Sequence, residues 1–200
     1  PFIKRLVAAL DSEFFCPDYL RRFRVRERLP VAQQREIALL LVERDSIARP
    51  AVRLSREARA DHYRRIASRL TALGDAREGI FTASFVCVSL ESKEAIKDVT
   101  LSTAARLRAI GDTYLTCVVL GDLGALYLGL SQPDSTRACY DEALRIAFRC
   151  RFPDQASRLL LHYARLHIRQ GRLAVAMDLV REAQRVCREF GGGATELHTV

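Results

Sequence analysis

The chain has 200 residues, of which 49% are hydrophobic, and it carries a formal net charge of +8 at pH 7. That length can hold one large domain or two small ones, and the apolar content is enough for a packed core. No apolar run approaches the roughly eighteen residues that a bilayer-spanning helix needs, so a transmembrane segment is not expected. The chain contains no asparagine, which excludes N-linked glycosylation within it.

Six cysteines are spread along the chain, with no CxxC pair and no histidine at metal-ligand spacing. This pattern is typical of small buried side chains in a reducing compartment, and it predicts a cytoplasmic protein. A disulfide framework or a zinc site is the alternative. The apolar start of the chain is short and is followed at once by "DSEFFCPDYL", which does not fit a signal peptide.

Positive charge is concentrated near the N-terminus, in the stretch "RRFRVRER" at residues 21–28. Such a run can contact nucleic acid or an acidic partner. No aromatic ladder or binding motif accompanies it, so a solvated helix face is the favoured interpretation, and nucleic acid is not the expected partner. The arginines concerned are Arg21, Arg22, Arg24, Arg26 and Arg28.

Most of the chain shows apolar residues at i, i+3, i+4 and i+7, which predicts an all-α protein. Turn signals recur at regular places and combine a glycine or proline with a cap for the next helix. The short connections predict antiparallel neighbours. In chain order we expect an irregular, basic helical region over 1–50, a helix within 55–73, and helices over about 75–91, 93–110, 113–130, 134–150, 154–169 and 172–190.

A shift of 40 residues aligns the chain with itself, and small residues then fall on small residues. A helix-turn-helix period of this length predicts a solenoid in which each pair buries its apolar face on the next. The matched pairs are Gly124 with Ala164, Thr136 with Ala176, and Ala143 with Ala183.

The spacing of Leu123-Gly124, Tyr127, Thr136, Tyr140 and Ala143 resembles the tetratricopeptide repeat (TPR). The resemblance implies a right-handed superhelical solenoid of antiparallel helix pairs over residues 51–200, in a variant with a 40-residue period. Small residues would allow close helix approach while aromatic residues fill the gap. The last residues align with the start of a further repeat, so we expect the array to be cut off at its C-terminal end. The structural positions implied are Gly124, Tyr127, Tyr140, Ala143, Ala164, Ala176 and Ala183.

Motifs for catalysis are missing from the sequence: it contains no GxGxxG, no GxxxxGK[ST] and no GxSxG. His162 and His167 are five residues apart on one predicted helix, so they point to different faces and do not form a metal pair. We therefore expect no enzymatic activity, no cofactor and no metal. The stretch from Ser55 shares a few residues with the recognition helix of LuxR-type DNA-binding domains, but the usual Thr-Val pair is replaced by Ala58-Arg59.

In TPR arrays the first helix of each pair lines a concave groove, so the resemblance implies a partner-binding surface. Arg158, Arg165 and Arg169 are seven and four residues apart and share one helix face. They would suit an acidic or amphipathic segment, or they are simply solvated. The groove residues implied are Phe81, Phe85, Val88, Val118, Ala125, Leu128, Arg158, Leu161, Arg165, Ile168 and Arg169.

The lack of asparagine excludes the asparagine clamp of co-chaperone TPR domains and the asparagine ladder of Pins-type adaptors within this chain. The sequence predicts a non-catalytic protein-interaction or scaffold module of a larger intracellular protein, whose partner is another protein and which can also self-associate. The alternative is a sensor or oligomerisation region of a signal-transduction ATPase or transcriptional regulator.

Overall fold

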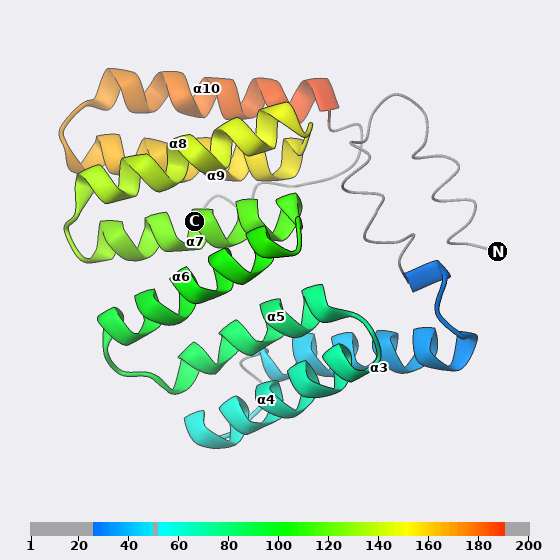
Figure 1. Ribbon diagram of the computed structural model, residues 1–200. Helices are drawn as coiled ribbons and strands as arrows, with labels where there is room; N and C mark the ends of the chain where they lie inside the picture. Colours follow the sequence, from blue (N-terminus) through cyan, green and yellow to red (C-terminus); the bar gives the residue numbers. More distant parts are fainter. Residues whose placement is uncertain (1–25, 50–51, 191–200) are drawn as a thin grey trace. The chain divides into compact units, whose positions relative to one another are not determined.

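The computed structural model describes residues 26–49 and 52–190. Within these ranges the regular secondary structure is entirely helical, with eight α-helices, one 3₁₀ helix and no strand (Figure 1), which confirms the predicted all-α fold. The helices are α3 (Val31–Ile47), α4 (Arg56–Ala72), α5 (Ala76–Ser84), η1 (Phe85–Ser89, the 3₁₀ helix), α6 (Lys93–Ala109), α7 (Thr113–Gly129), α8 (Pro133–Arg149), α9 (Pro153–Arg169) and α10 (Leu173–Phe190).

From residue 93 onward the helix bounds agree with the sequence prediction to within one residue at each end. The predicted helix over 75–91 is instead divided into α5 and η1. Two serine hydroxyls donate to carbonyl oxygens three residues earlier, Ser84 to Phe81 at 2.6 Å and Ser89 to Val86 at 2.9 Å. Such local bonds compete with the regular α-helical ladder, which favours the tighter 3₁₀ winding here.

Within residues 1–50, for which the sequence predicts an irregular, basic helical region, α3 is a helix of 17 residues. Its apolar residues lie on two faces: Ile37, Leu40 and Ile47 are buried, while Leu39 and Val42 are exposed. Because hydrophobic residues occur all round, the helix shows little of the one-sided pattern that sequence reading depends on.

Five of the helices end in a residue with positive φ, and from residue 111 onward these residues recur every 20 positions. In each turn the next N–H donates to the carbonyl oxygen five residues earlier, at 2.8 to 3.0 Å. This is the Schellman arrangement, which satisfies free carbonyls at a helix end and reverses the chain. The residues are Gly74, Gly111, Ser131, Arg151 and Gly171.

The described helices form two compact units. The N-terminal unit runs to Leu115 and the C-terminal unit begins at Thr116, so that α7 starts in the first and continues in the second. In the N-terminal unit α4 packs against both α3 and α5, and α5 packs against α6. α3 therefore shares a core with the helices after residue 51. That core consists of Ile37, Leu40, Ile47, Tyr63, Ile66, Leu70 and Leu73.

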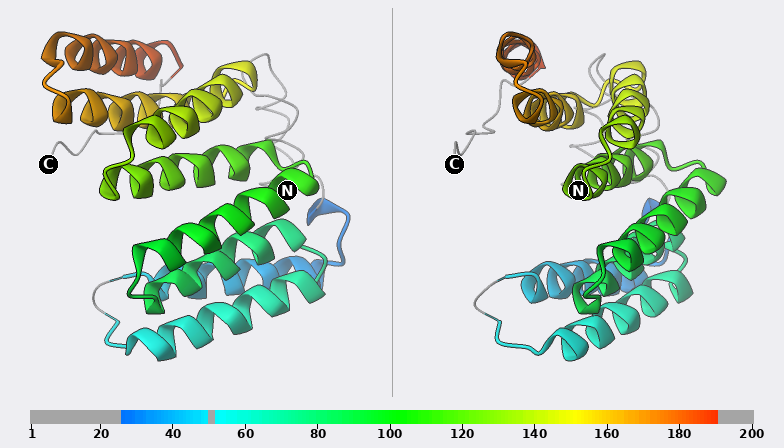
Figure 2. Two further views of the ribbon diagram at one scale, coloured as in Figure 1. Left: turned by 60° about the vertical axis from the view of Figure 1, so that its left-hand side comes forward. Right: turned by 90° about the vertical axis from the view of Figure 1, so that its left-hand side faces the viewer.

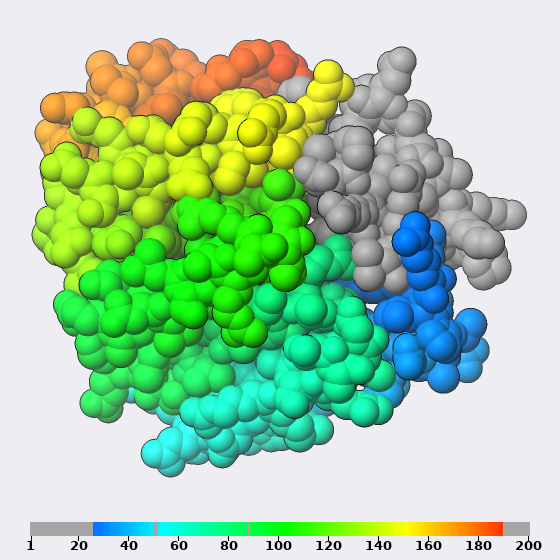
Figure 3. Space-filling view, viewed as in Figure 1, coloured from blue at the N-terminus to red at the C-terminus, as the bar shows by residue number. Residues whose placement is uncertain are grey.

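In the C-terminal unit α8, α9 and α10 run side by side in alternating directions, with α9 packed against both of the others (Figures 1 and 2). Side chains fill the spaces between neighbouring helices within each unit (Figure 3). Gly124 and the small residues of the repeat are buried, and Tyr127 is half-buried on α7. The buried alanines are Ala143, Ala164, Ala176 and Ala183.

Candidate functional site

Helix α9 carries the three arginines that sequence reading placed on one face. Its only acid is Asp154, in the first turn, where a negative charge is favourable next to the helix N-terminus. The opposite side of the helix is buried through Leu159, Leu160 and Leu166. The arginines therefore lie on the side of α9 that is left open by the core.

Arg158 is held against α7. One terminal nitrogen lies 3.4 Å from the carbonyl oxygen of Val118, and the other lies 3.6 Å from a carboxylate oxygen of Asp122. Desolvation raises the pKa of Asp122 and the charge of Arg158 opposes that rise. The Asp122 side chain is 53% exposed to solvent and lies 3.6 Å from a guanidinium, so its carboxylate is negatively charged at neutral pH. The negative charge of Asp122 thus offsets part of the positive charge of Arg158.

Arg169 is fixed in a similar way, because its guanidinium donates to the carbonyl oxygen of Leu128 at 2.8 Å. The two bonds from α9 to α7 span 40 and 41 residues, which is the period found in the sequence. Equivalent positions of α7 and α9 therefore lie next to each other. A guanidinium has five donors, so the single bond orients Arg169 while most of its donors stay available.

Arg165 is exposed, and no hydrogen bond or ion pair is found for it among residues 26–49 and 52–190. Beside it, Ile168 is 53% exposed, and Leu161 and Leu128 are half-buried. Cationic and apolar groups thus alternate here. We call this surface the α7–α9 face; its residues are Val118, Asp122, Leu128, Arg158, Leu161, Arg165, Ile168 and Arg169.

Tyr140 of α8 supports this face from within. A Cβ atom placed on Gly124 would lie 2.3 Å from Cε1 of the Tyr140 ring, so only glycine allows the ring to approach α7 this closely. On its other side the ring centroid is 6.1 Å from that of His162 and 5.7 Å from that of Tyr163. The absence of a side chain at Gly124 therefore sets the spacing of α7, α8 and α9.

The buried groups beneath the face are held neutral. Burial, together with the neighbouring Cys139, raises the pKa of Tyr140 to about 12. Its hydroxyl has no hydrogen-bond partner within the described part of the chain. Burial lowers the pKa of His162, and the positive charges of Arg158 and Arg165 lower it further. The positive charge of the face therefore comes from arginine alone at neutral pH.

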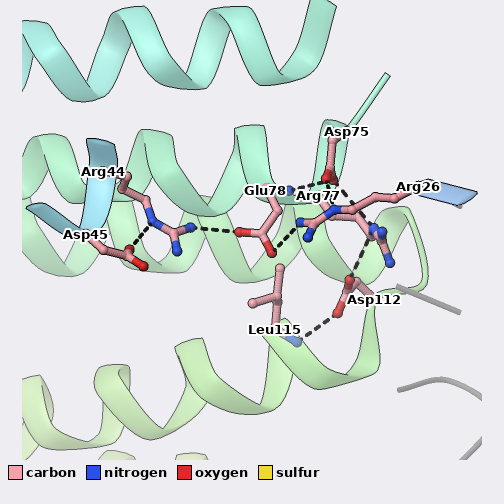
Figure 4. A network of polar contacts seen from close by, with 8 residues as sticks. All are labelled: Arg26, Arg44, Asp45, Asp75, Arg77, Glu78, Asp112 and Leu115. Carbon is pink, nitrogen blue, oxygen red and sulfur yellow. Dashed lines mark hydrogen bonds and ion pairs between the residues drawn. The ribbon is translucent and has the colours of Figure 1, made fainter. Parts of the chain in front are cut away.

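A second charged cluster lies inside the N-terminal unit (Figure 4). Arg26 pairs with Asp75 at 2.7 Å and with Glu78 at 3.2 Å, and Arg44 pairs with Glu78 at 2.8 Å. Arg77 lies 3.8 Å from Asp75 and 3.9 Å from Asp112. The Asp75 side chain is fully buried. These acids face arginines on several sides, as expected of an ionic network that ties helices together.

The same acids also cap helices. A carboxylate oxygen of Asp75 accepts from the N–H of Glu78 at 3.3 Å, at the start of α5. Asp112 accepts from the N–H of Leu115 at 2.8 Å, at the start of α7. Arg26 is thereby committed to the interior of its unit, and it is not available to a nucleic acid. Arg28 is exposed; Arg21, Arg22 and Arg24 lie outside the described residues.

Phe81 and Phe85 are half-buried in the N-terminal unit. Their ring centroids are 5.1 Å apart, and that of Phe85 is 5.3 Å from that of Tyr63. The Arg44 guanidinium lies 5.9 Å from the centroid of each phenylalanine ring. Both aromatic side chains thus contribute to packing around α4. The side chain of Val88 lies outside the described part.

Sequence reading identified the arginines but missed Asp122 and the ionic network. The contact between Arg158 and Asp122 could have been predicted from the 40-residue period. Val118 lies one period before Arg158, and Asp122 is one helical turn further along α7. The signal for the network was weaker. Asp75 and Asp112 follow glycines in predicted turns, and a turn position alone does not reveal which arginine will contact the carboxylate.

Within residues 26–49 and 52–190 no group of three or more histidine, cysteine or acidic side chains could hold a metal ion. The five cysteines in those ranges are free thiols. No helix there has the length and apolar character that crossing a membrane requires. A scan against protein-family models and a search of curated proteins both found no significant match to the chain.

Proposed function

We propose that this chain is a non-catalytic protein-interaction module that docks an acidic or amphipathic segment of a partner protein on the α7–α9 face. The observation that carries the proposal is the 2.8 Å hydrogen bond that fixes Arg169 on the carbonyl oxygen of Leu128, beside the exposed Arg165 and Ile168. An acidic segment with one apolar side complements both the arginines and the isoleucine.

The arrangement favours binding because part of the conformational entropy that binding would remove is already lost in the free protein. Arg169 is already oriented by the carbonyl of Leu128. A side chain that is fixed in the free protein loses less conformational entropy on binding than a freely rotating one. Arg165 adds a second cation about 6 Å further along α9, given the rise of 1.5 Å per residue.

We further propose that the helices form a TPR-like array. Support comes from the repeated length of 17 residues for most helices, the turns every 20 residues after residue 111, and the buried small residues one period apart. The hydrogen bonds from α9 to α7 join positions 40 and 41 residues apart. Each of these features is typical of stacked helix pairs.

The proposal is tested by selecting a phage-displayed library of random dodecapeptides against the whole chain. We expect enrichment of peptides that contain Asp or Glu together with an apolar residue. The Arg165→Glu/Arg169→Glu variant should lose this enrichment, because the cations that would bind the acids are reversed.

A matched control is available on α8, where Arg145 and Arg149 are also exposed and one helical turn apart. Arg145→Glu/Arg149→Glu changes the net charge by the same amount in the same unit and should keep the enrichment. The proposal fails if the parent selects no acidic peptides, or if both double variants lose them equally. Circular dichroism melting of each variant establishes that it remains folded.

One observation favours self-association as a second candidate. Val31, Leu39 and Val42 on α3 are 63%, 70% and 64% exposed, which is unusual for large apolar side chains on one helix. Light scattering of the parent beside Leu39→Glu tests this alternative. A dimer that becomes a monomer in the variant would favour an oligomerisation role, and a monomeric parent would exclude it.

A further inference from the structure

Charge is distributed unevenly along the α7–α9 face. At one end Arg158 lies 3.6 Å from Asp122, so the pair is close to neutral. At the other end Arg165 and Arg169 face no acid among the described residues. By helix geometry Arg158 and Arg165 are about 10 Å apart along α9. The face therefore changes from nearly neutral to doubly positive within the length of a short peptide.

We propose that Asp122 is a specificity determinant: the face takes a partner segment whose acidic residues are confined to one end, where Arg165 and Arg169 bind them, and Asp122 rejects acids at the other end. The inference rests on the proposed function, because it concerns the chemistry of the segment docked there. It adds which part of that segment must be acidic and which part must not.

The physical reason is repulsion between like charges. Asp122 is the only acid of α7, and its carboxylate is half exposed on the face. A partner carboxylate brought to about 4 Å from it in a water-like dielectric would weaken binding by up to a factor of about five in Kd, because Arg158, 3.6 Å away, offsets part of the repulsion. Discrimination against an unwanted partner by a misplaced like charge is a general device in specific interfaces.

Asp122 has a competing role that predicts the opposite effect. If its purpose is only to hold Arg158 in a binding position, then removal of its charge would weaken binding of acidic peptides. If it repels acids, removal of its charge would strengthen binding of peptides that are acidic at both ends. The Asp122→Asn variant separates the two roles, because it keeps the size of the side chain and removes its charge.

The experiment uses the same dodecapeptide library against the parent and Asp122→Asn, with Asp178→Asn as control. Asp178 is an exposed acid on α10 that pairs with Arg181 at 3.0 Å, so the control removes an equal charge from the same unit. Peptides selected by the parent and by the control should carry their acids in one half. Peptides selected by Asp122→Asn should carry them in both halves.

Two synthetic peptides make the test quantitative. The first is the most enriched parent sequence, and the second is the same peptide with two Glu residues added at its non-acidic end. Fluorescence anisotropy should show the second binding the parent about two- to fivefold more weakly, with the difference disappearing in Asp122→Asn. An undiminished difference, or weaker binding of both peptides to Asp122→Asn, would overturn the role of Asp122.

The outcomes also distinguish the two proposals. If Arg165→Glu/Arg169→Glu abolishes binding of the first peptide while Asp122→Asn leaves the difference between the two peptides intact, then the docking face stands and the inference about Asp122 fails. If the parent enriches no acidic peptide at all, the proposed function fails together with the inference.

Discussion

Ser131 holds a left-handed backbone conformation, with φ of 58°, at a turn position where three of the five turns have glycine. A residue with a Cβ is strained there by roughly 1–2 kcal/mol. Ser131→Gly relieves this strain at some cost in the entropy of the unfolded chain. We expect a net gain in unfolding free energy of about 0.5–1 kcal/mol, measured by urea denaturation.

The reverse substitution in the same unit is the control. Gly171 has φ of 71°, and a Cβ atom added to it would meet nothing within 4 Å. Gly171→Ala should therefore destabilise through backbone strain alone, by about 1 kcal/mol. Equal effects of the same sign in both variants would contradict the assignment of these turns.

Tyr140 contributes its ring and not its hydroxyl, because the side chain is buried and the hydroxyl lacks a partner within the described residues. Tyr140→Phe should leave the unfolding free energy at pH 7 unchanged or raise it by up to about 1 kcal/mol. In contrast, Tyr163→Phe loses a 2.9 Å bond to Asp141 and should cost about 0.5–1 kcal/mol. A loss above 1 kcal/mol for Tyr140→Phe would show that its hydroxyl is satisfied.

The same tyrosine makes stability depend on alkaline pH. The folded protein keeps the Tyr140 proton up to a pKa of about 12, whereas the unfolded chain releases it near the ordinary tyrosine pKa of 10.0. Above pH 10 the unfolded state therefore binds fewer protons, and stability falls as pH rises toward 12. Cys117, whose pKa burial raises from 9.0 to about 12, acts in the same direction. Tyr140→Phe should make the fall less steep.

At the scale of helices, the contact of Gly124 with Tyr140 determines how closely α7 and α8 pack. Gly124→Ala should cost about 1–3 kcal/mol, because a buried ring has no room to move away. One 40-residue period later the same two positions are Ala164 and Val180, a larger residue facing a smaller one. The double variant Gly124→Ala/Tyr140→Val imitates that pair.

We expect the double variant to be at least about 1 kcal/mol more stable than the sum of the two single effects predicts. A double-mutant cycle of urea denaturation curves measures this coupling energy. Strict additivity would mean that Gly124 and Tyr140 do not share one space, and that the proposed repeat register is wrong.

In the N-terminal unit, Arg26 connects the segment before α3 to the start of α5. Arg26→Ala removes one arginine partner from each of the buried acids Asp75 and Glu78. We expect the unfolding free energy to fall by about 2 kcal/mol. Arg28 is two residues away and exposed, so Arg28→Ala should change stability by less than about 0.5 kcal/mol. Indistinguishable melting curves for the two variants would show that the network contributes little.

Local signals explain which helices could be predicted. The helices after residue 93 begin and end at glycine, proline and aspartate signals that act within a few residues. The division of 75–91 depends on two serine bonds, and α3 is apolar on two sides, so neither follows from periodicity. The arginine row could be predicted because it lies on one helix. The Arg158–Asp122 pair joins two helices and required the alignment of α7 with α9.

At the scale of the whole molecule, the net charge of +8 does not identify the binding surface, because many of the basic side chains are paired with acids. Arg26, Arg44 and Arg77 face buried acids, and Arg185 on α10 pairs with Glu182 and Glu189. No acid is found beside Arg165 or Arg169 among the described residues, and Arg169 is held by the carbonyl oxygen of Leu128. Binding through them should weaken as salt concentration rises, since exposed charges are screened.

A charge-swap titration tests this account most directly. The peptide most enriched by the parent is titrated by calorimetry into the parent and into Arg165→Glu/Arg169→Glu, and a second peptide with each acid replaced by lysine is titrated into both. We predict that each protein binds only the peptide of opposite charge, while Arg145→Glu/Arg149→Glu behaves like the parent. Binding of the acidic peptide by all three proteins with equal affinity would contradict the assignment of the α7–α9 face.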